Sequence, residues 1–388
     1  MDDQPAPAPA PAPHQRRKRY AGRNPRNFAE KYKEHQPDRY ADTVAKVLAA
    51  GKTPAGSHRP IMVAEILEVL APRPGELAVD ATLGFGGHAR EILPRLEPGG
   101  RLIGLDADPI ELPKTEKRLR ELGFGPDRFI AHRSNFAGLP KALAEFCSQP
   151  DVTGREGSPL PAARSEAIDG APGATRPDGG DIILADLGVS SMQIDDPARG
   201  FSVKFDGPLD MRMNPQRGQP ASALLAKIKP DALAALLVEN ADEPHADALA
   251  TILAGKTFAT TRALAAAIRA ALPRLNQEAG DLSIRRVFQA LRIAVNDEFS
   301  ALDTFLRNLP MCLNPGGRVA ILTFHSGEDR RVKKAFAAGL RDGLYADIAH
   351  DVIRPTADER NANPRSAPAK LRWARRVTKK NFTMDKHG

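Results

Sequence analysis

The sequence predicts an α/β fold with a mainly parallel sheet and an all-helical insertion. Short apolar runs alternate with longer helical patterns, which is typical of successive β-α-β units. A glycine-rich turn follows the first apolar run, as expected where a strand leads into a helix beside a ligand. Alanine-rich helical patterns lie between the fourth and the fifth apolar run, and they predict an all-helical insertion of about 90 residues.

The apolar runs expected to form strands lie at 77–80, 102–106, 129–132, 182–186 and 318–324. Helices are expected to start near Met62, Gly87, Glu111 and Leu139. Beyond the fourth run, the helical patterns cover 231–238, 246–253, 261–272 and 283–306. An insertion at this point of the chain is predicted to lie over the carboxyl edge of the sheet, where ligands bind in open α/β folds.

Composition divides the chain into segments. A Pro/Ala-rich basic arm covers 1–56, where no fixed fold is expected. The α/β domain is predicted to comprise 57–194 and 284–375, interrupted by a Gly- and Pro-rich mobile insert at 148–180. The all-helical insertion, 195–283, is predicted to bind substrate, and a basic tail covers 376–388.

Positive charge is concentrated at both ends of the chain. Residues 1–56 carry a net charge of +5 and residues 364–388 carry +7, although the whole chain carries only +8. Basic ends commonly contact phosphate backbones, so a nucleic-acid partner is expected; the alternative is a solubilising tail. Two cysteines and no long apolar run or signal core predict a cytoplasmic protein without a membrane partner. Monomer and homodimer stay open.

The turn at 80–89 points to an adenosine-containing cofactor. Gly84, Gly86 and Ala89 fit the G-x-G-x-x-A pattern of NAD-binding folds. Asp80 precedes them, and its carboxylate would repel a pyrophosphate but attract the sulfonium and ammonium of S-adenosylmethionine. We therefore favour a methyl-donor site, while a nicotinamide site and a turn without ligand remain alternatives. No spacing of His, Cys or Asp predicts a metal site.

Three polar residues end apolar runs and are expected at the carboxyl edge of the sheet. Asp106 ends the second run and can accept both hydroxyls of a ribose. Asp186 ends the fourth run and is our candidate catalytic residue, since it can accept a hydrogen bond from a substrate amine, the cofactor ammonium or adenine. His325 follows the fifth run and is a second catalytic candidate, which would position substrate or contact RNA. Loop stabilisation by Asp186 and a purely structural histidine are the alternatives.

Candidate substrate contacts lie in the loop after 186 and in the helical pattern at 288–298. Arg199 and Arg212 can contact phosphate or stack on a base, and Asp210 can receive a substrate N–H. The alternative is a self-contained loop joined by Asp–Arg pairs. In the helical pattern, one polar face is predicted to point toward RNA or the catalytic loop, and it carries Gln289, Arg292 and Asn296.

Together these motifs resemble the family of ribosomal RNA small subunit methyltransferase H, also called RsmH or MraW. The similar stretches span nearly all of 57–375, and two are highly specific: Asp-Gly-Pro-Leu-Asp-Met-Arg-Met at 206–213 and Phe-Gln-Ala-Leu-Arg-Ile-Ala-Val-Asn at 288–296. The resemblance implies a Rossmann-like class I fold that uses S-adenosylmethionine. It implies N4-methylation of a cytidine in the decoding region of 16S rRNA, with that RNA or the small ribosomal subunit as partner.

Matching motif by motif, the resemblance implies these cofactor residues: Gly86, Gly87, His88, Asp106, Phe136, Asp186 and Gln193. Phe136 follows the third apolar run, where an aromatic ring can stack on adenine. The chain departs from the family pattern at Met192 and Gly327, where polar neighbours are kept, so activity is expected to survive. At 367–370 the chain lacks an Arg-Ser pair that the family pattern has, so any role of that arginine in the family has no counterpart in this chain.

The implied chemistry needs an acceptor for the amino hydrogens, because the N4 lone pair of cytosine is delocalised into the ring. Asp186 or a carbonyl at 187–189 is the candidate acceptor, and the base is expected to leave its stack. A strong general base is not required, since the proton can leave after transfer. A nicotinamide-dependent dehydrogenase and a non-catalytic RNA-binding assembly factor are the rival hypotheses.

Overall fold

The computed structural model describes residues 60–148 and 179–378, which belong to one compact unit, His58–Gly388. The predicted arm at 1–56, nearly all of the insert at 148–180 and the tail beyond 378 lie outside the described residues. Within the described ranges, no helix is both long enough and apolar enough to span a membrane.

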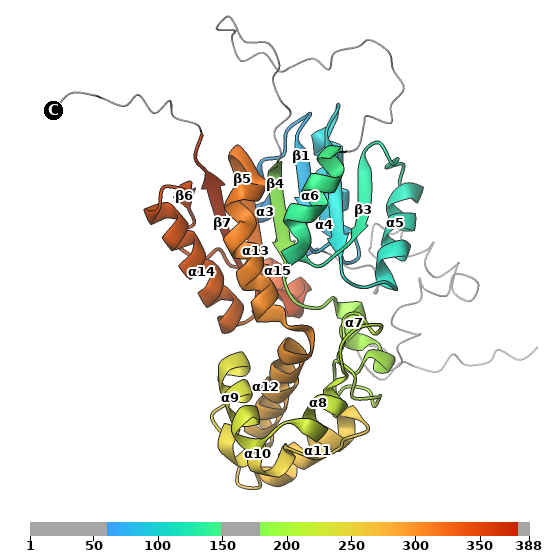
Figure 1. Ribbon diagram of the computed structural model, residues 1–388, viewed down its shortest axis with the longest axis vertical. Helices are drawn as coiled ribbons and strands as arrows, with labels where there is room; N and C mark the ends of the chain where they lie inside the picture. The colour runs from blue at the N-terminus through green and yellow to red at the C-terminus, as the bar shows by residue number, and fades with distance from the viewer. Residues whose placement is uncertain (1–59, 149–178, 379–388) are drawn as a thin grey trace, which may run out of the picture. The chain divides into compact units, whose positions relative to one another are not determined.

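A seven-stranded sheet has the strand order β3-β2-β1-β4-β5-β7-β6 (Figure 1). Its parallel part pairs β1 (Leu77–Asp80), β2 (Arg101–Asp106), β3 (Phe129–Arg133), β4 (Gly180–Asp186) and β5 (Leu313–Thr323). These confirm the five predicted strands, although β5 starts at Leu313 rather than Arg318. The two strands β6 (Tyr345–Ile348) and β7 (Lys370–Arg376) were not predicted; β7 runs antiparallel to both β5 and β6.

The central strands send alternate side chains into two separate cores. Val79, Ile103 and Ile183 lie in one core, which is closed by α6 (Leu139–Ser148), α13 (Glu298–Cys312) and α14 (Ser326–Arg341). Their neighbours in sequence, Ala78, Leu102 and Ile182, lie in the other core with α3 (Val63–Leu70), α4 (Gly87–Ile92) and α5 (Glu111–Glu121). Helices therefore cover both faces of the sheet (Figure 1). The four helix starts predicted before the insertion are confirmed to within one residue.

A third core belongs to the helices α8 (Ala221–Lys227), α9 (Pro230–Ala241), α10 (Ala246–Leu253), α11 (Thr261–Ala271) and α12 (Gln277–Asn296). Local sequence starts two of them: Thr260 and Asn276 accept backbone N–H groups of the first turns of α11 and α12. The helical patterns predicted at 231–238, 246–253 and 261–272 are confirmed.

The single helix predicted over 283–306 is wrong. Asp297 has a φ of 51°, in the left-handed region, so α12 ends there and α13 starts at the next residue. Helix α12 also runs across the predicted domain boundary between 283 and 284. The remaining helical turns are η2 (Leu93–Leu96), η3 (Phe136–Gly138), α7 (Ser191–Asp195), η4 (Pro197–Arg199), α15 (Ala357–Ala362) and η5 (Pro364–Ser366).

Candidate functional site

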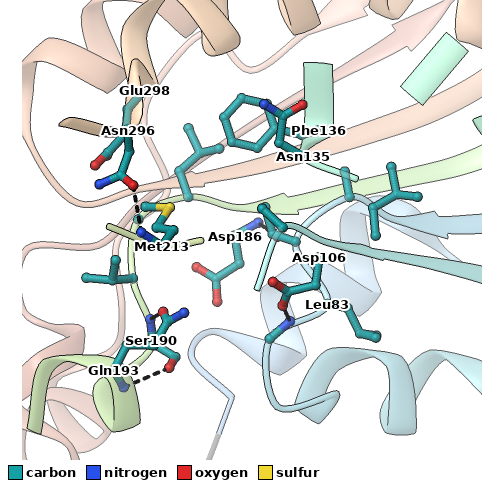
Figure 2. Close-up of a pocket in the computed structure, with 18 of the residues that line it drawn as sticks. Leu83, Asp106, Asn135, Phe136, Asp186, Ser190, Gln193, Met213, Asn296 and Glu298 are labelled. Carbon is teal, nitrogen blue, oxygen red and sulfur yellow. Dashed lines mark hydrogen bonds between the residues drawn. The ribbon is translucent and has the colours of Figure 1, made fainter. Parts of the chain in front are cut away.

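A cavity of about 1380 Å³ opens at the carboxyl ends of the parallel strands. One wall is formed by the turn after β1, the ends of β2 and β4, and the segment at 132–136. The other wall is formed by the loop at 213–218 and the junction of α12 with α13. Figure 2 shows side chains from both walls around Asp186. The cavity thus lies between the sheet and the helical part of the chain.

The glycine-rich turn is shaped by two residues with positive φ. Gly84 has a φ of 49° and Gly86 a φ of 77°, and a Cβ on Gly86 would lie 2.9 Å from the Cγ2 of Thr115 on α5. The hydroxyl of Thr115 also donates to the carbonyl of Gly84 over 2.6 Å. Gly84 and Gly87 line the cavity, whereas Gly86 does not. Gly86 therefore acts on the cavity through the shape of the turn.

Asp106 joins this turn to the end of β2. Its two carboxylate oxygens accept the backbone N–H of Gly84 (2.9 Å) and of Asp108 (2.8 Å). Burial raises the pKa of Asp106 to about 6, against the opposing effect of these two hydrogen bonds. Each oxygen retains acceptor capacity, so the carboxylate suits a ligand with two adjacent hydroxyls. A ribose carries such a pair of hydroxyls.

Asp186 lies at the end of β4, with its backbone N–H donating to the Thr82 hydroxyl over 2.6 Å. The Nε2 of His88 is 3.5 Å from its Oδ2. Although burial lowers the pKa of His88, the carboxylates of Asp186 and Asp80 outweigh it, and the pKa is raised. Neither His88 Nε2 nor Asp186 Oδ1 forms a hydrogen bond with a described residue. Both atoms are buried, whereas the Asp186 side chain as a whole is 29% exposed and lines the cavity.

Asp80 is not where its predicted role requires it. The side chain is 1% exposed, accepts the backbone N–H of Thr82 over 3.1 Å and does not line the cavity. Burial raises its pKa to about 6. The interpretation of Asp80 as the attraction for a cationic donor is therefore corrected: Asp106 and Asp186 supply the carboxylates that line this side of the cavity.

Gln193 and Phe136 both line the cavity and are fixed by neighbours (Figure 2). Gln193 donates to the carboxylate of Asp108 over 2.8 Å and accepts the backbone N–H of Ser190 over 2.9 Å. Phe136 packs edge-to-face on Phe305 of α13, with ring centroids 5.6 Å apart. Both side chains are thus already oriented by the protein itself.

The loop that follows α7 is held by Asp–Arg pairs, one within the loop and one to Asp108 outside it. Arg199 donates to the Asp108 carboxylate over 2.8 Å and to the carbonyls of Arg212 and Met213. Arg212 in turn forms a two-point pair with Asp210, over 2.8 and 2.7 Å. Arg199, Asp210 and Arg212 do not line the cavity. The structure thus shows one Asp–Arg pair of the loop itself, Asp210 with Arg212, and a contact of Arg199, Asp210 or Arg212 with RNA stays a prediction.

The predicted polar face of α12 divides into three environments. Gln289 donates to the carbonyl of Asn240 over 3.0 Å and does not line the cavity. Asn296 lines it, donates to the Met211 carbonyl (2.8 Å) and accepts the Met213 N–H (2.7 Å), which fixes the adjacent loop. Arg292 lines it too. Its Nε and Nη2 donate to the two oxygens of Glu298, each over 2.9 Å.

Two glutamates at this wall were not predicted. Glu298 is the first residue of α13, and Glu328 lies in the first turn of α14; both line the cavity. Burial and the Glu328 carboxylate raise the pKa of Glu298, against the Arg292 guanidinium. For Glu328, burial is outweighed by His325 and Arg292, so its pKa is lowered. The sequence shows the run Asn296-Asp297-Glu298, but Glu298 can be assigned to the cavity only once the helix break at Asp297 is known.

His325 caps α14 and does not line the cavity. Its Nδ1 accepts the backbone N–H of Glu328 over 3.4 Å, and its Nε2 is 3.1 Å from the Glu328 carboxylate. The structure therefore shows His325 in contact with Glu328, and a role for His325 in positioning substrate or contacting RNA stays a prediction. In the described part of the chain, no group of three or more His, Cys, Asp or Glu side chains is arranged to bind a metal ion.

Comparisons with known proteins give one consistent match. A family model described as the MraW methylase family matches residues 55–377. The "Ribosomal RNA small subunit methyltransferase H 1" of Lachnoclostridium phytofermentans is 46% identical over 370 residues, covering 93% of each chain. The "Ribosomal RNA small subunit methyltransferase H 2" of Alkaliphilus metalliredigens is 48% identical over 369 residues, covering 93% of this chain and 97% of its own.

Proposed function

The chain belongs to the MraW methylase family, and we propose that it transfers a methyl group from S-adenosylmethionine to N4 of a cytidine in the decoding region of 16S rRNA. One observation carries the assignment of the site. Two strand-end carboxylates, Asp106 and Asp186, line one cavity beside a glycine turn. Carboxylates suit a cationic donor rather than a pyrophosphate. The proposed substrate places the activity in the cytoplasm.

The cofactor fits the sheet-side wall. S-adenosylmethionine, when bound, supplies an electrophilic methyl group on a sulfonium. Asp106 would accept the two ribose hydroxyls with its remaining lone pairs, and Phe136 would stack on adenine. His88 and Asp186 line the cavity and would meet polar groups of the cofactor or the acceptor. Gly87 and Gln193 complete this wall, and Gly86 acts through the turn.

The acceptor amine requires orientation rather than strong activation. The lone pair of N4 is delocalised into the ring, so an acceptor for the amino hydrogens helps to turn that lone pair toward the methyl group. Asp186 is 29% exposed at the cavity and is our candidate for this acceptor. To reach it, the cytosine would have to leave its stack. The excess proton can leave for solvent after transfer, so no base stronger than a carboxylate is needed.

Methyl transfer to small ribosomal subunits tests the proposal. Subunits from a strain that lacks this methylation are incubated with the protein and isotope-labelled S-adenosylmethionine, and the rRNA is digested and analysed by mass spectrometry. We expect label on N4 of one cytidine. Label on another nucleoside would correct the target, and binding without transfer would favour a non-catalytic assembly factor. The rival dehydrogenase hypothesis does not fit membership in a methylase family.

A further inference from the structure

We propose that Arg292 and Glu298 together read the Watson–Crick edge of the acceptor base and select cytosine. The inference rests on the proposed function and adds the residues that recognise the base. Both side chains line the cavity, and their two charged groups are joined by two hydrogen bonds of 2.9 Å. In Figure 2, Glu298 and Asp106 lie on opposite sides of Asp186.

The donor and acceptor pattern of this pair matches cytosine. The edge of cytosine presents one donor, the N4 amino group, followed by two acceptors, N3 and O2. A carboxylate beside a guanidinium presents the complement, one acceptor followed by donors. Uracil presents an acceptor, a donor and an acceptor, so its O4 would face the Glu298 carboxylate. Glu298 would accept one amino hydrogen of cytosine while Asp186 accepts the other.

In the described part of the chain, Arg292 keeps the Nη1 donors free, whereas Arg318 and Arg199 use theirs. Arg318 bonds Glu76 through both terminal nitrogens and also donates to the carbonyls of Leu70 and Ala71. Arg199 likewise uses both terminal nitrogens. Arg292 donates only through Nε and Nη2, and within the described residues no acceptor faces its Nη1. Two N–H groups at a cavity wall are thus available to a ligand.

The surroundings favour the charged form of Arg292 at a site where burial is unfavourable. The side chains of Arg292 and Glu298 are 17% and 11% exposed, and a buried ion pair contributes little net stability. The carboxylate of Glu328, which also lines the cavity, helps to raise the pKa of Arg292 against the effect of burial, and it raises the pKa of Glu298 as well. Asn296, on the same helix, fixes the neighbouring loop wall. An oriented ion pair at an open cavity is suited to recognition.

A substrate analogue separates recognition from structural support. Small subunits are reconstituted with either cytidine or 3-deazacytidine at the target position; the analogue keeps the amino group but replaces N3 by C–H. Single-turnover methylation is measured for the wild type and for Arg292→Lys, which keeps the charge and loses the planar donors. For each protein we take the ratio of the cytidine rate to the 3-deazacytidine rate. The intrinsic reactivity of the analogue affects both ratios equally, so the difference between the two ratios reports the contact of Arg292 with N3.

We expect the wild type to methylate the analogue about 10- to 100-fold more slowly than cytidine, and Arg292→Lys to lose most of that difference. The matched control is Arg318→Lys, which alters a similar buried pair away from the cavity and should leave the wild-type ratio unchanged. Glu298→Gln gives a second test: its turnover should fall at least 10-fold while its affinity for S-adenosylhomocysteine is kept.

Equal slowing of both substrates by Arg292→Lys would show that the pair only supports the helix junction, and would overturn the inference while leaving the proposed function intact. A wild type that does not discriminate against the analogue would overturn it as well. If Arg292→Lys does not fold, normal turnover by Glu298→Gln would overturn the inference and reduced turnover with kept affinity would support it. A wild type that transfers no methyl group to either substrate would overturn both proposals.

Discussion

The imidazole of His88, at the start of α4, lies 3.5 Å from the carboxylate of Asp186, at the end of β4. The carboxylates of Asp186 and Asp80 outweigh the opposing effect of burial on His88, so the pKa of His88 is raised and its imidazolium form is favoured. The glycine-rich turn therefore orients the candidate catalytic carboxylate directly. The turn can reach Asp186 because it follows β1, the strand that pairs with β4.

Replacing Asp186 by alanine is expected to lower turnover at saturating cofactor by about 100-fold or more, because the amino hydrogens of the acceptor lose their oriented partner. Turnover is measured on small subunits with labelled S-adenosylmethionine. His88→Gln is the companion variant and should lose less, since it removes only the orienting charge. Near wild-type turnover by Asp186→Ala would remove Asp186 from the mechanism.

Asp106→Asn should weaken binding of S-adenosylhomocysteine by about 10- to 100-fold, the value of a charge-assisted hydrogen bond. Because the pKa of Asp106 is raised to about 6, the wild-type carboxylate gains a proton as the pH falls through 6, and affinity should fall with it. The variant should lack that dependence. Calorimetry between pH 5 and pH 8 checks both points, and an unchanged affinity at pH 8 would contradict the ribose role.

Asp80→Asn should stabilise the protein at neutral pH. Asp80 has a pKa raised from 3.8 to about 6 in the folded state, so the folded protein binds its proton more tightly than the unfolded chain. Stability from this group is present below pH 3.8 and is lost as the pH rises to 6. The variant should therefore gain up to about 3 kcal/mol at pH 7 and little at pH 4. Urea unfolding at both pH values measures the difference.

Arg199→Ala should destabilise the protein rather than weaken RNA binding. Its partner Asp108 is 1% exposed, and removing one member of a buried pair costs about 3–5 kcal/mol. Arg212→Ala is the control: its side chain and that of Asp210 are 21% and 25% exposed, so the expected loss is about 1 kcal/mol. Thermal unfolding ranks the two variants. If the two variants were equally stable and Arg199→Ala bound RNA more weakly, the result would support the predicted contact of Arg199 with RNA.

Removing residues 1–56 should weaken RNA association and flatten its salt dependence, because each phosphate contact adds about 0.9 to the slope of log K against log salt. The segment carries a net charge of +5 and lies outside the described residues. Filter binding to 16S rRNA at several salt concentrations measures the slope. The same slope with and without the segment would mean that it makes no phosphate contact.

Local sequence was sufficient for the central strands and for the residues at their ends. Apolar runs locate β1, β2 and β4, and a residue that ends a parallel strand lies at the ligand edge, so Asp106 and Asp186 were found. Strand β7 was missed because three arginines interrupt its apolar pattern. It depends on pairing with β5, a contact between residues distant in sequence.

The sequence could not show which polar residues satisfy one another. Arg199 and Asp108 are 91 positions apart, and their pairing changes a candidate RNA contact into an internal one. Glu298 was missed because a continuous helix was expected, and only the left-handed residue Asp297 brings it to the cavity. The helical periodicity of polar residues identifies a polar face of a helix, but which residues that face contacts depends on the tertiary fold.

Helix α12 has a consequence for how a large substrate is sensed. Its residues near Ile284 are packed among the other helices of the insertion, and Arg292 and Asn296 lie at the cavity. The rise of an α-helix puts Ile284 and Asn296 about 18 Å apart along one rigid rod. If a docked small ribosomal subunit tilts the helical insertion, it therefore displaces Arg292 and Asn296 as well. Docking of the subunit is then coupled to the position of the reacting base.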